Sequence, residues 1–500
     1  MFERTLLRFS DNPADRWTID DAFKGVSILG GTGSGKTTAS GKALAIEYLS
    51  QGWGGLVLCA KSDEAQLWRD YCKLAHRTQD LIIFGKNAVH SDGDHKGEKI
   101  VFNAIQYESE RHGEGAGATL NLTNIFMNIY RMGNRISGEG DTKEERYWDN
   151  ALKRCLNRII ELIKLAEEKL TYSNMVNLLS STVTITEDKF DEENEFIKET
   201  NDFSRLDKPD LYCIKCLLKA YYTNFKQRKA DEETENSYRL VYNYFLLDIP
   251  AMGEKMRSTI TESFMGLAEP FLSGVLYSHF AGVTNIFPEW AYEKKKIIVL
   301  NFGIKEYLDA GILAQCVFKL LFQQAIERRD VSQHPLPVFL WADEAQYFIN
   351  PYDQIFLTTA RSSQTATVFL SQNISNYLAI MGSGDVSRSR VDSLMGNLST
   401  KIFHANSDAA TNEYASRLIG MDKDELPSVQ YSEDAHFSLT QNKAKTLTTS
   451  FQSQVQAKEF TTLKSGGVNH DFTVEAIIMA TGREWSDGKN FIRTEFTQEF

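Results

Sequence analysis

The sequence predicts an α/β protein in which a mostly parallel β-sheet is interrupted by a long all-α insertion. Three observations favour this fold class. Short apolar strands alternate with helical segments in the first hundred residues, and the alternation returns after residue 283. Between these parts, residues 107–282 show helical periodicity and few strand signals. A glycine-rich loop follows the first apolar strand. Continuous apolar strands between helices are typical of a parallel sheet that is covered on both faces.

The individual elements follow from the same patterns. Apolar strands are expected at 26–29, 55–60, 80–85, 99–103, 296–301, 337–342, 366–371 and 401–404, with edge strands at 472–479 and 491–496. Helices are expected at 38–45, 63–76, 310–329, 354–360 and 409–419, and within the insertion at 120–132, 147–170 and 210–228. We interpret the polar stretch 187–210, which contains an acidic run, as a solvated loop.

The most specific motif is Gly30-Gly31-Thr32-Gly33-Ser34-Gly35-Lys36-Thr37, which fits the P-loop pattern G-x-x-x-x-G-K-[ST] in full. It stands between a strand and a helix, which is the context that the motif requires. Glycines let backbone N–H groups approach phosphate oxygens, and the helix N-terminus adds partial positive charge. We expect Lys36 to contact the β- and γ-phosphates of ATP and the Thr37 hydroxyl to bind Mg²⁺. The expected ATP-binding residues are Gly30, Gly31, Thr32, Gly33, Ser34, Gly35, Lys36, Thr37 and Thr38.

A later strand, Leu340-Trp341-Ala342, ends in the two carboxylates Asp343 and Glu344. In P-loop enzymes a strand of the same sheet ends in an Asp that holds the Mg²⁺ shell, and Asp343 fits that role. Glu344 is then the candidate general base for the attacking water. Acids at a strand end can instead cap the next helix, but the P-loop favours the catalytic interpretation.

Two further residues have open roles. Gln372 ends the strand after the acidic one, where its amide can contact the γ-phosphate or be an ordinary polar residue at a strand end. Arg361 follows a short helix, where it can stabilise transition-state charge in a neighbouring subunit's site. A cation at a helix C-terminus is also favourable by itself. The motifs divide the chain into an N-terminal part of a nucleotide-binding domain (1–106), an all-α insertion domain (107–282) and the C-terminal part of the nucleotide-binding domain (283–500).

Composition excludes several classes of protein. The net charge of −12 argues against a surface coated for nucleic acid, although a local basic channel is compatible with it. No stretch approaches the roughly 20 apolar residues of a membrane helix, so we expect a cytoplasmic protein that meets the membrane only through a partner. The six cysteines are scattered, and the single C-x-x-C of Cys213 and Cys216 has no second pair. We therefore expect reduced thiols and no zinc site.

The assembled motifs resemble the conjugative coupling proteins of type IV secretion (TraG/TraD-like), within the FtsK/HerA-type branch of RecA-like P-loop motor ATPases. The resemblance rests on the P-loop, the long insertion, Trp341-Ala342-Asp343-Glu344-Ala345, Ala360-Arg361 and Phe369-Leu370-Ser371-Gln372. It implies ATP hydrolysis coupled to DNA movement by a homo-oligomer, usually a hexameric ring. It also implies that Arg361 is an arginine finger acting in a neighbour's site and that Gln372 is a sensor of the γ-phosphate.

The same resemblance implies partners and reveals two departures. The insertion is expected to face secretion-channel or relaxosome-type proteins, at the inner face of the cell membrane. Membrane-bound members of the family carry N-terminal transmembrane helices, whereas this P-loop begins at Gly30. The second strand of the family often ends in an acid followed by Pro-Lys, whereas here Leu58 is followed by Cys59-Ala60-Lys61-Ser62-Asp63.

We therefore predict an ATP-driven DNA translocase or coupling ATPase. Arg388 and Arg390 follow a Gly/Ser-rich loop and are candidates for DNA phosphate contacts, although such a pair is often merely exposed. Two alternatives stay open. One is a secretion ATPase that acts on protein substrates or channel components, which the acidic balance favours. The other is a nucleotide-gated scaffold that recognises a partner through residues 107–282.

Overall fold

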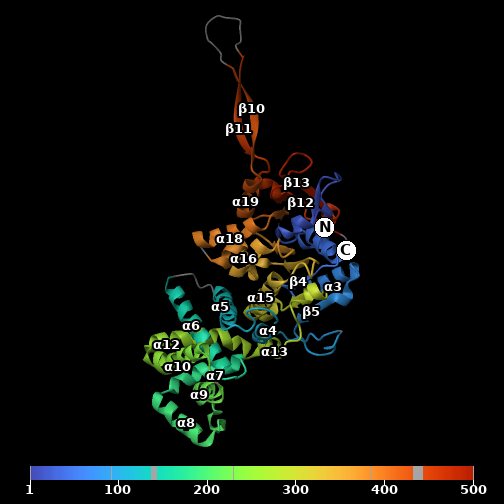
Figure 1. Cartoon of the computed structure of the whole chain (residues 1–500). Coiled ribbons are helices and arrows are strands. Elements are labelled where there is room, and N and C mark those ends of the chain that lie inside the picture. The colour runs from blue at the N-terminus through green and yellow to red at the C-terminus, as the bar shows by residue number, and fades with distance from the viewer. Residues whose placement is uncertain are drawn as a thin grey trace.

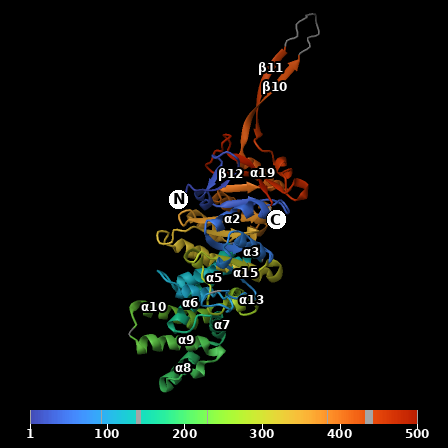
Figure 2. The same cartoon turned by 90° about the vertical axis from the view of Figure 1, so that its right-hand side faces the viewer.

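The computed structural model describes residues 2–91, 93–136, 143–228, 230–382, 384–431 and 443–498. The molecule is elongated in both views, with a central β-sheet between two unlike ends (Figures 1 and 2). Helices of the insertion form one end, and a long β-hairpin projects from the other (Figures 1 and 2).

Within the described residues the central sheet has nine strands in the order β13-β12-β9-β3-β8-β7-β4-β6-β5. Their bounds are β3 (Val26–Leu29), β4 (Gly54–Leu58), β5 (Leu81–Gly85), β6 (Ile297–Asn301), β7 (Val338–Ala342), β8 (Thr365–Ser371), β9 (Thr400–Phe403), β12 (Thr473–Ala480) and β13 (Phe491–Thr497). The seven strands from β9 to β5 are mutually parallel, and β12 pairs antiparallel with β9 and β13. The predicted mostly parallel sheet is confirmed. Of the two predicted edge strands, β13 lies at the edge, whereas β12 lies inside the sheet between β13 and β9.

Both faces of the sheet are covered, which explains why its inner strands are apolar throughout. Side chains alternate along each strand, so Val57 and Trp341 belong to one buried cluster, while Leu56 and Leu340 belong to the other. The helices packed on the sheet are α1 (Ile19–Phe23), α2 (Lys42–Ser50), α3 (Glu64–Leu74), α15 (Ile304–Arg328), α16 (Pro351–Thr359), α17 (Ile374–Met381), α18 (Asp385–Asn397) and α19 (Ala409–Ile419). Helices α1 to α3 contribute to the first cluster, and α15 to α19 contribute to the second.

Between β5 and β6, the described residues from 104 onward form a series of helices. Its helices are α4 (Ala104–Glu110), α5 (Thr119–Ile136), α6 (Lys143–Leu165), α7 (Tyr172–Ser181), α8 (Glu187–Thr200), α9 (Tyr212–Tyr221), α10 (Glu232–Asn243), α11 (Ile249–Ala251), α12 (Glu254–Ala268), α13 (Gly274–Phe280) and α14 (Trp290–Glu293). Apolar side chains such as Leu156, Ile160 and Phe245 are fully buried between them. The helical segment begins a few residues before 107 and ends after 282, so the domain boundaries themselves stay a prediction.

Two local predictions were wrong. Residues 99–103 form no strand beyond an isolated bridge between Lys99 and Val89. Their backbone is instead bonded to the segment before β6: Val101 N–H donates to the Asn285 side chain (2.8 Å), and Phe102 N–H donates to the His279 carbonyl (2.8 Å). An apolar run satisfied in this way looks like a strand in sequence, because periodicity does not reveal its hydrogen-bond partner.

The acidic stretch 187–210 was expected to be a loop, but its first part, from Glu187 to Thr200, is helix α8. Thr186 caps it by accepting a hydrogen bond from Lys189 N–H, and two acids, Glu187 and Asp188, lie in the first turn. Phe190 and Ile197 are buried beneath the charged face. Two apolar residues seven positions apart therefore outweigh the acidic composition that suggested a loop.

Two hairpins were not predicted. One pairs β1 (Thr5–Arg8) with β2 (Arg16–Thr18), and the other pairs β10 (Met421–Tyr431) with β11 (Lys443–Ser453) and forms the projecting end in Figures 1 and 2. The threonine-rich alternation at 446–451 was the available signal for the second hairpin. In the described part of the chain, no helix combines the length and apolar character needed to cross a membrane.

Candidate nucleotide-binding site

The predicted site residues other than Arg361 lie at one edge of the central sheet. The P-loop follows β3, Asp343 and Glu344 follow β7, and Gln372 follows β8. These three strands are neighbours in the order β3-β8-β7, and they are parallel. Their carboxyl ends therefore point the same way, and ligands of open α/β sheets bind at that edge.

The P-loop has the backbone that its glycines were expected to provide. Gly33 and Gly35 have φ values of 75° and 85°, which other residues rarely adopt. A side chain at Gly35 would also collide with Val474 of β12, because its Cβ would lie 2.5 Å from the valine methyl group. The loop leads into a π-helical turn, Thr37–Gly41, in which Gly41 N–H donates to the Lys36 carbonyl at 2.9 Å. Such turns are common at functional sites.

Thr37 and Asp343 are brought together from positions far apart in the chain. The Thr37 hydroxyl donates to Asp343 Oδ2 at 3.1 Å. Tyr71 of α3 donates to the Thr37 carbonyl at 3.2 Å, which fixes the start of the P-loop helix. Burial raises the pKa of Asp343, and the positive charge of nearby Lys36 opposes that shift. A buried carboxylate beside a hydroxyl and a lysine is the arrangement expected of a site for Mg²⁺ and phosphate.

Glu344 is held between two amides and is linked to the P-loop. Its Oε1 accepts from Gln372 Nε2 at 3.0 Å, and its Oε2 accepts from Gln346 Nε2 at 3.0 Å. Gln372 in turn accepts from the Thr32 hydroxyl at 3.3 Å. Glu344 also has a φ of 46°, a strained value for a residue with a side chain. The structure thus connects P-loop, Gln372 and Glu344 through one continuous polar path.

Sequence reasoning missed Glu64, a buried carboxyl group at the start of α3. Its Oε2 accepts from Ala60 N–H at 2.9 Å, and its Oε1 is buried without a hydrogen-bond partner among the described residues. Burial, and then the negative charge of Asp343, raise the pKa of Glu64 to about 9. The available signal was an acid in the first turn of the helix after the second strand. In contrast, Lys61 and Asp63 are exposed.

His404 was also missed as part of this edge. It follows β9, and its Nε2 lies 2.7 Å from the Ser40 hydroxyl. Its Nδ1 lies 3.0 Å from the Glu475 carbonyl oxygen, so Nδ1 carries the proton and Nε2 accepts from Ser40. Burial, together with the charge of Lys36, lowers the pKa of His404 to about 4. A neutral histidine therefore braces the π-helical turn that follows the P-loop.

The oxygen donors of this edge fit a Mg²⁺ ion. Asp343 and the Thr37 hydroxyl are adjacent, and the negative charge of Asp343 contributes to the raised pKa of the Glu64 carboxyl group. Among the described residues there is no cluster of three or more His, Cys, Asp or Glu ligands. The chain could therefore supply only part of a coordination shell, which is normal for Mg²⁺ that also takes phosphate oxygens and water.

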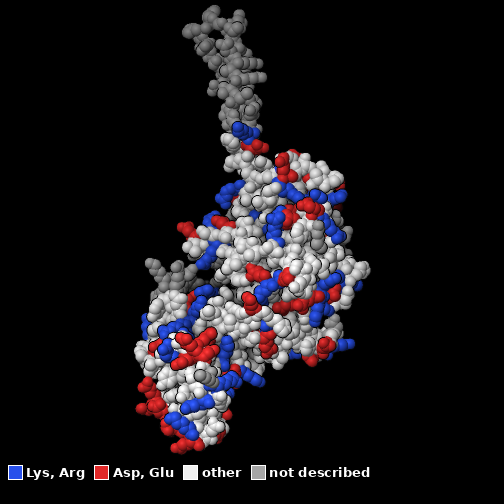
Figure 3. Space-filling view, viewed as in Figure 1, with Lys and Arg blue, Asp and Glu red and all other residues white. Residues whose placement is uncertain are grey.

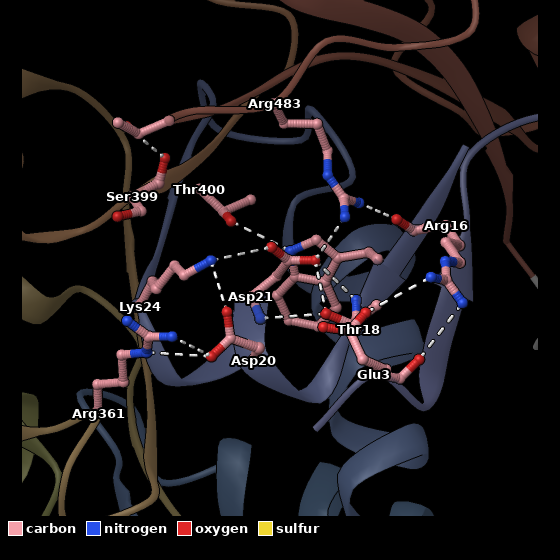
Figure 4. A network of polar contacts seen from close by, with 12 residues as sticks. Glu3, Arg16, Thr18, Asp20, Asp21, Lys24, Arg361, Ser399, Thr400 and Arg483 are labelled. Carbon is pink, nitrogen blue, oxygen red and sulfur yellow. Dashed lines mark hydrogen bonds and ion pairs between the residues drawn. The ribbon is translucent and has the colours of Figure 1, made fainter. Parts of the chain in front are cut away.

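Arg361 lies elsewhere. It sits between the end of α16 and the start of β8, whereas Gln372 follows the other end of that strand. Seven residues of extended strand separate the two ends by roughly 20 Å. Arg361 donates to Asp20 through Nη2 (2.9 Å) and Nε (3.0 Å), and its side chain is 66% exposed (Figure 4). The structure does not bring Arg361 to the P-loop of its own chain.

Arg388 and Arg390, the candidates for DNA phosphate contacts, are both exposed on α18. On the face drawn in Figure 3, basic and acidic side chains are interspersed over the sheet and the insertion. That face therefore offers no extended basic surface in the residues that the structure describes.

Comparisons with known proteins found one family model and several solved structures. A family model described as "TraM recognition site of TraD and TraG" matches residues 337–464. The bacterial conjugative coupling protein TrwBdeltaN70, in an unbound form, is 12% identical, with a TM-score of 0.56 and coverage of 100% of this chain and 90% of that chain. The plasmid coupling protein TrwB in complex with ADP and Mg²⁺ is likewise 12% identical, with a TM-score of 0.55 and the same coverage. TrwB with the non-hydrolysable ATP analogue ADPNP is 11% identical, with a TM-score of 0.53 and coverage of 100% and 96%.

No curated protein matches the chain. The structural likeness, at this identity, establishes the fold, so the predicted RecA-like P-loop domain with an all-α insertion is confirmed. The family model and the structures together confirm the predicted resemblance to conjugative coupling proteins.

Proposed function

We propose that this chain is a Mg²⁺-dependent ATP hydrolase that moves DNA, or a nucleoprotein substrate, as a coupling ATPase of conjugative type IV secretion. The observation that carries the proposal is the polar path from Thr32 through Gln372 to Glu344, beside the Thr37–Asp343 contact. These residues follow three different strands of the sheet. Nucleotide hydrolysis requires groups that bind phosphate, bind Mg²⁺ and accept a proton to lie close together. The likeness to TrwB solved with ADP and Mg²⁺ and with an ATP analogue supports this nucleotide.

Each residue of the edge has a distinct task in this proposal. The backbone of 30–38 and the Lys36 ammonium bind the phosphates, while Thr37 and Asp343 hold Mg²⁺. When bound, that ion neutralises charge that develops on the phosphate oxygens. Glu64 is buried near Asp343, and its raised pKa keeps it protonated near neutral pH, so it offers a neutral carboxyl group to the ion's hydration shell.

Glu344 and Gln372 act as a pair in the proposal. Glu344 accepts the proton of the attacking water at its carboxylate, as a general base. Gln372 bonds both Glu344 and Thr32, so a change at the P-loop alters the hydrogen bonding of the base. This link gives Gln372 the role of a sensor of the nucleotide state.

Arg361 completes the site only in an assembly. Because it lies at the edge opposite its own P-loop, it could reach a phosphate only in a second copy of the chain. We therefore propose a homo-oligomer, in the form of a hexameric ring, with the ATP site between subunits and Arg361 as the arginine finger. The insertion, and the region matched by the recognition-site model, are the surfaces proposed for secretion-channel and relaxosome-type partners.

The decisive experiment is ATP turnover by the full chain at low salt, with and without duplex or single-stranded DNA. DNA is expected to stimulate turnover, since a motor couples hydrolysis to its track. Glu344→Gln should lower turnover by about a hundredfold or more while ATP binding is retained, because an amide cannot accept the proton. The control is Glu413→Gln, which makes the same change at an exposed position of α19.

The outcomes separate the candidate functions. DNA stimulation that is lost in Glu344→Gln supports the DNA motor. Turnover that responds to a secretion-channel protein but to neither form of DNA would favour a secretion ATPase for protein cargo, which the net charge of −12 also favours. A Glu344→Gln variant that supports transfer as well as the parent would identify a nucleotide-gated scaffold.

A further inference from the structure

Arg361 is held by a carboxylate that is itself shared between two cations (Figure 4). Asp20 accepts both contacts from Arg361 at one oxygen, Oδ1. The other oxygen, Oδ2, lies 2.7 Å from the Lys24 ammonium. Desolvation raises the pKa of Asp20, but the hydrogen bonds and charges of Lys24 and Arg361 outweigh it and bring the pKa below its ordinary value. Asp20 is therefore an ionised group bonded on both of its oxygens.

Asp20 stands on a rigid support. Helix α1, which carries it, begins with a capping box in which Thr18 and Asp21 satisfy each other's backbone N–H groups. Arg483 pairs with Asp21 at 3.3 Å and also donates to the Arg16 carbonyl. Just before the helix, the buried Trp17 indole donates to Thr400 of β9 at 3.1 Å. The carboxylate that holds Arg361 is thus fixed relative to the central sheet.

The arrangement leaves Arg361 charged and accessible. A guanidinium has five N–H donors, and Asp20 accepts from only two of its nitrogens, so donors remain on the outer side. Lys24 also lies 3.6 Å from Asp21, which in turn pairs with Arg483, so the charges of this group (Arg361, Lys24, Arg483, Asp20 and Asp21) sum to one net positive charge. The side chain also lines a surface hollow of about 390 Å³ with Phe2, Asp20, Phe23, Thr358 and Ser362.

We propose that Asp20 is a positioning residue that orients Arg361 for a nucleotide phosphate bound by a second copy of the chain, and that Lys24 preserves the positive charge of the pair. This inference rests on the proposed function, in which Arg361 acts in a neighbour's site. An arginine side chain loses conformational freedom when it is ordered, so a fixed partner removes that loss from the catalytic step. Asp20 does not touch the phosphate in this arrangement and acts only through Arg361.

The test is ATP turnover by the full chain carrying Asp20→Asn, Asp20→Glu, Arg361→Ala or the Asp20→Asn/Arg361→Ala pair. Asp20→Asn is expected to lower kcat by about three- to tenfold with KM for ATP little changed, since positioning affects the transition state and not the binding of ATP. Asp20→Glu should recover part of that loss because it restores the charge. In the Arg361→Ala background, Asp20→Asn should have no further effect.

Glu3→Gln is the matched control, since Glu3 belongs to the same network but pairs with Arg16 and not with Arg361 (Figure 4). Its kcat should stay at the parent's value, and the thermal midpoints of the single variants should fall by only a few degrees. If Arg361→Ala lowers turnover but Asp20→Asn does not, the positioning role is overturned while the proposed function stands. An equal loss from Asp20→Asn with and without Arg361, or a gain in kcat on removing Asp20, also overturns it. Unchanged turnover in Arg361→Ala would instead refute the trans finger itself.

Discussion

The two ends of helix α16 lie toward opposite edges of the sheet, and their charged residues are held in opposite ways. In its first turn, Asp353 pairs with Lys319 of α15 at 2.6 Å, and both side chains are fully buried. Two residues after the helix, the Arg361 side chain is 66% exposed in its pair with Asp20. The buried pair belongs to the edge that carries Glu344, and the exposed pair belongs to the edge that faces away from it.

The difference shows how one helix can serve two kinds of site. Lys319 also donates to the Phe348 carbonyl at 2.7 Å, and Asp353 accepts from Asn350 N–H at 2.6 Å. These bonds fix the turn that follows Glu344, so this residue with its strained backbone stands beside a rigid segment. Arg361 has no such enclosure, which suits a cation that must meet a group from outside its own chain. The side chains of the first edge are held by contacts within one chain, whereas Arg361 at the second edge is exposed and available to another molecule.

The largest effect on stability is expected from Asp353→Asn. The substitution leaves Lys319 as a buried charge without a carboxylate, which costs about 3–5 kcal/mol of unfolding free energy. Urea unfolding followed by tryptophan fluorescence would measure it, because Trp17, Trp53, Trp68 and Trp341 are buried in the sheet region. The Lys319→Met/Asp353→Leu pair should recover only part of the loss, since Asn350 N–H and the Gln323 amide also donate to Asp353. A single variant as stable as the parent would show that the buried pair does not hold this edge.

The next effect is a dependence of stability on pH that comes from His404. Its pKa in the folded chain is about 4, against 6.5 for an unperturbed histidine, so the unfolded chain binds the extra proton between these values. Stability is therefore fully present above pH 6.5 and falls as the pH drops toward 4, by roughly 3 kcal/mol in total. His404→Gln should remove that part of the pH dependence. His112→Gln, at an exposed position, is the control and should leave the pH profile unchanged.

The site at the carboxyl ends of β3, β7 and β8 was largely predictable, because most of its functional residues lie in short contiguous motifs. The P-loop and the apolar strand before Asp343 each form a contiguous motif, and parallel strands must bring their carboxyl ends together. What the motifs could not give is the pairing between loops. The bond from Thr32 to Gln372, and the bracing of Ser40 by His404, join segments hundreds of residues apart. The periodicity of apolar residues in the sequence gives no information about such contacts.

Three other features could not be predicted from the sequence, and each has a physical reason. Residues 99–103 are as apolar as a strand, but their hydrogen bonds go to side chains and to the segment before β6. Helix α8 is acidic enough to suggest a loop, yet a capping threonine and two buried apolar residues hold it. Asp20, which pairs with Arg361, is separated from it by most of the chain and belongs to no motif.

The smallest effect on stability is expected at the exposed edge, and it is the sharpest test of the comparison. Asp20→Asn makes the same chemical change as Asp353→Asn at the other end of α16, but it should cost less than about 1 kcal/mol. In 1 M salt the cost should vanish, since the screening length falls to roughly 3 Å. Urea unfolding of both variants in low and high salt measures the contrast. If Asp20→Asn destabilised the chain as strongly as Asp353→Asn, then Arg361 would be a structural cation, held too firmly by its own chain to serve a neighbouring molecule.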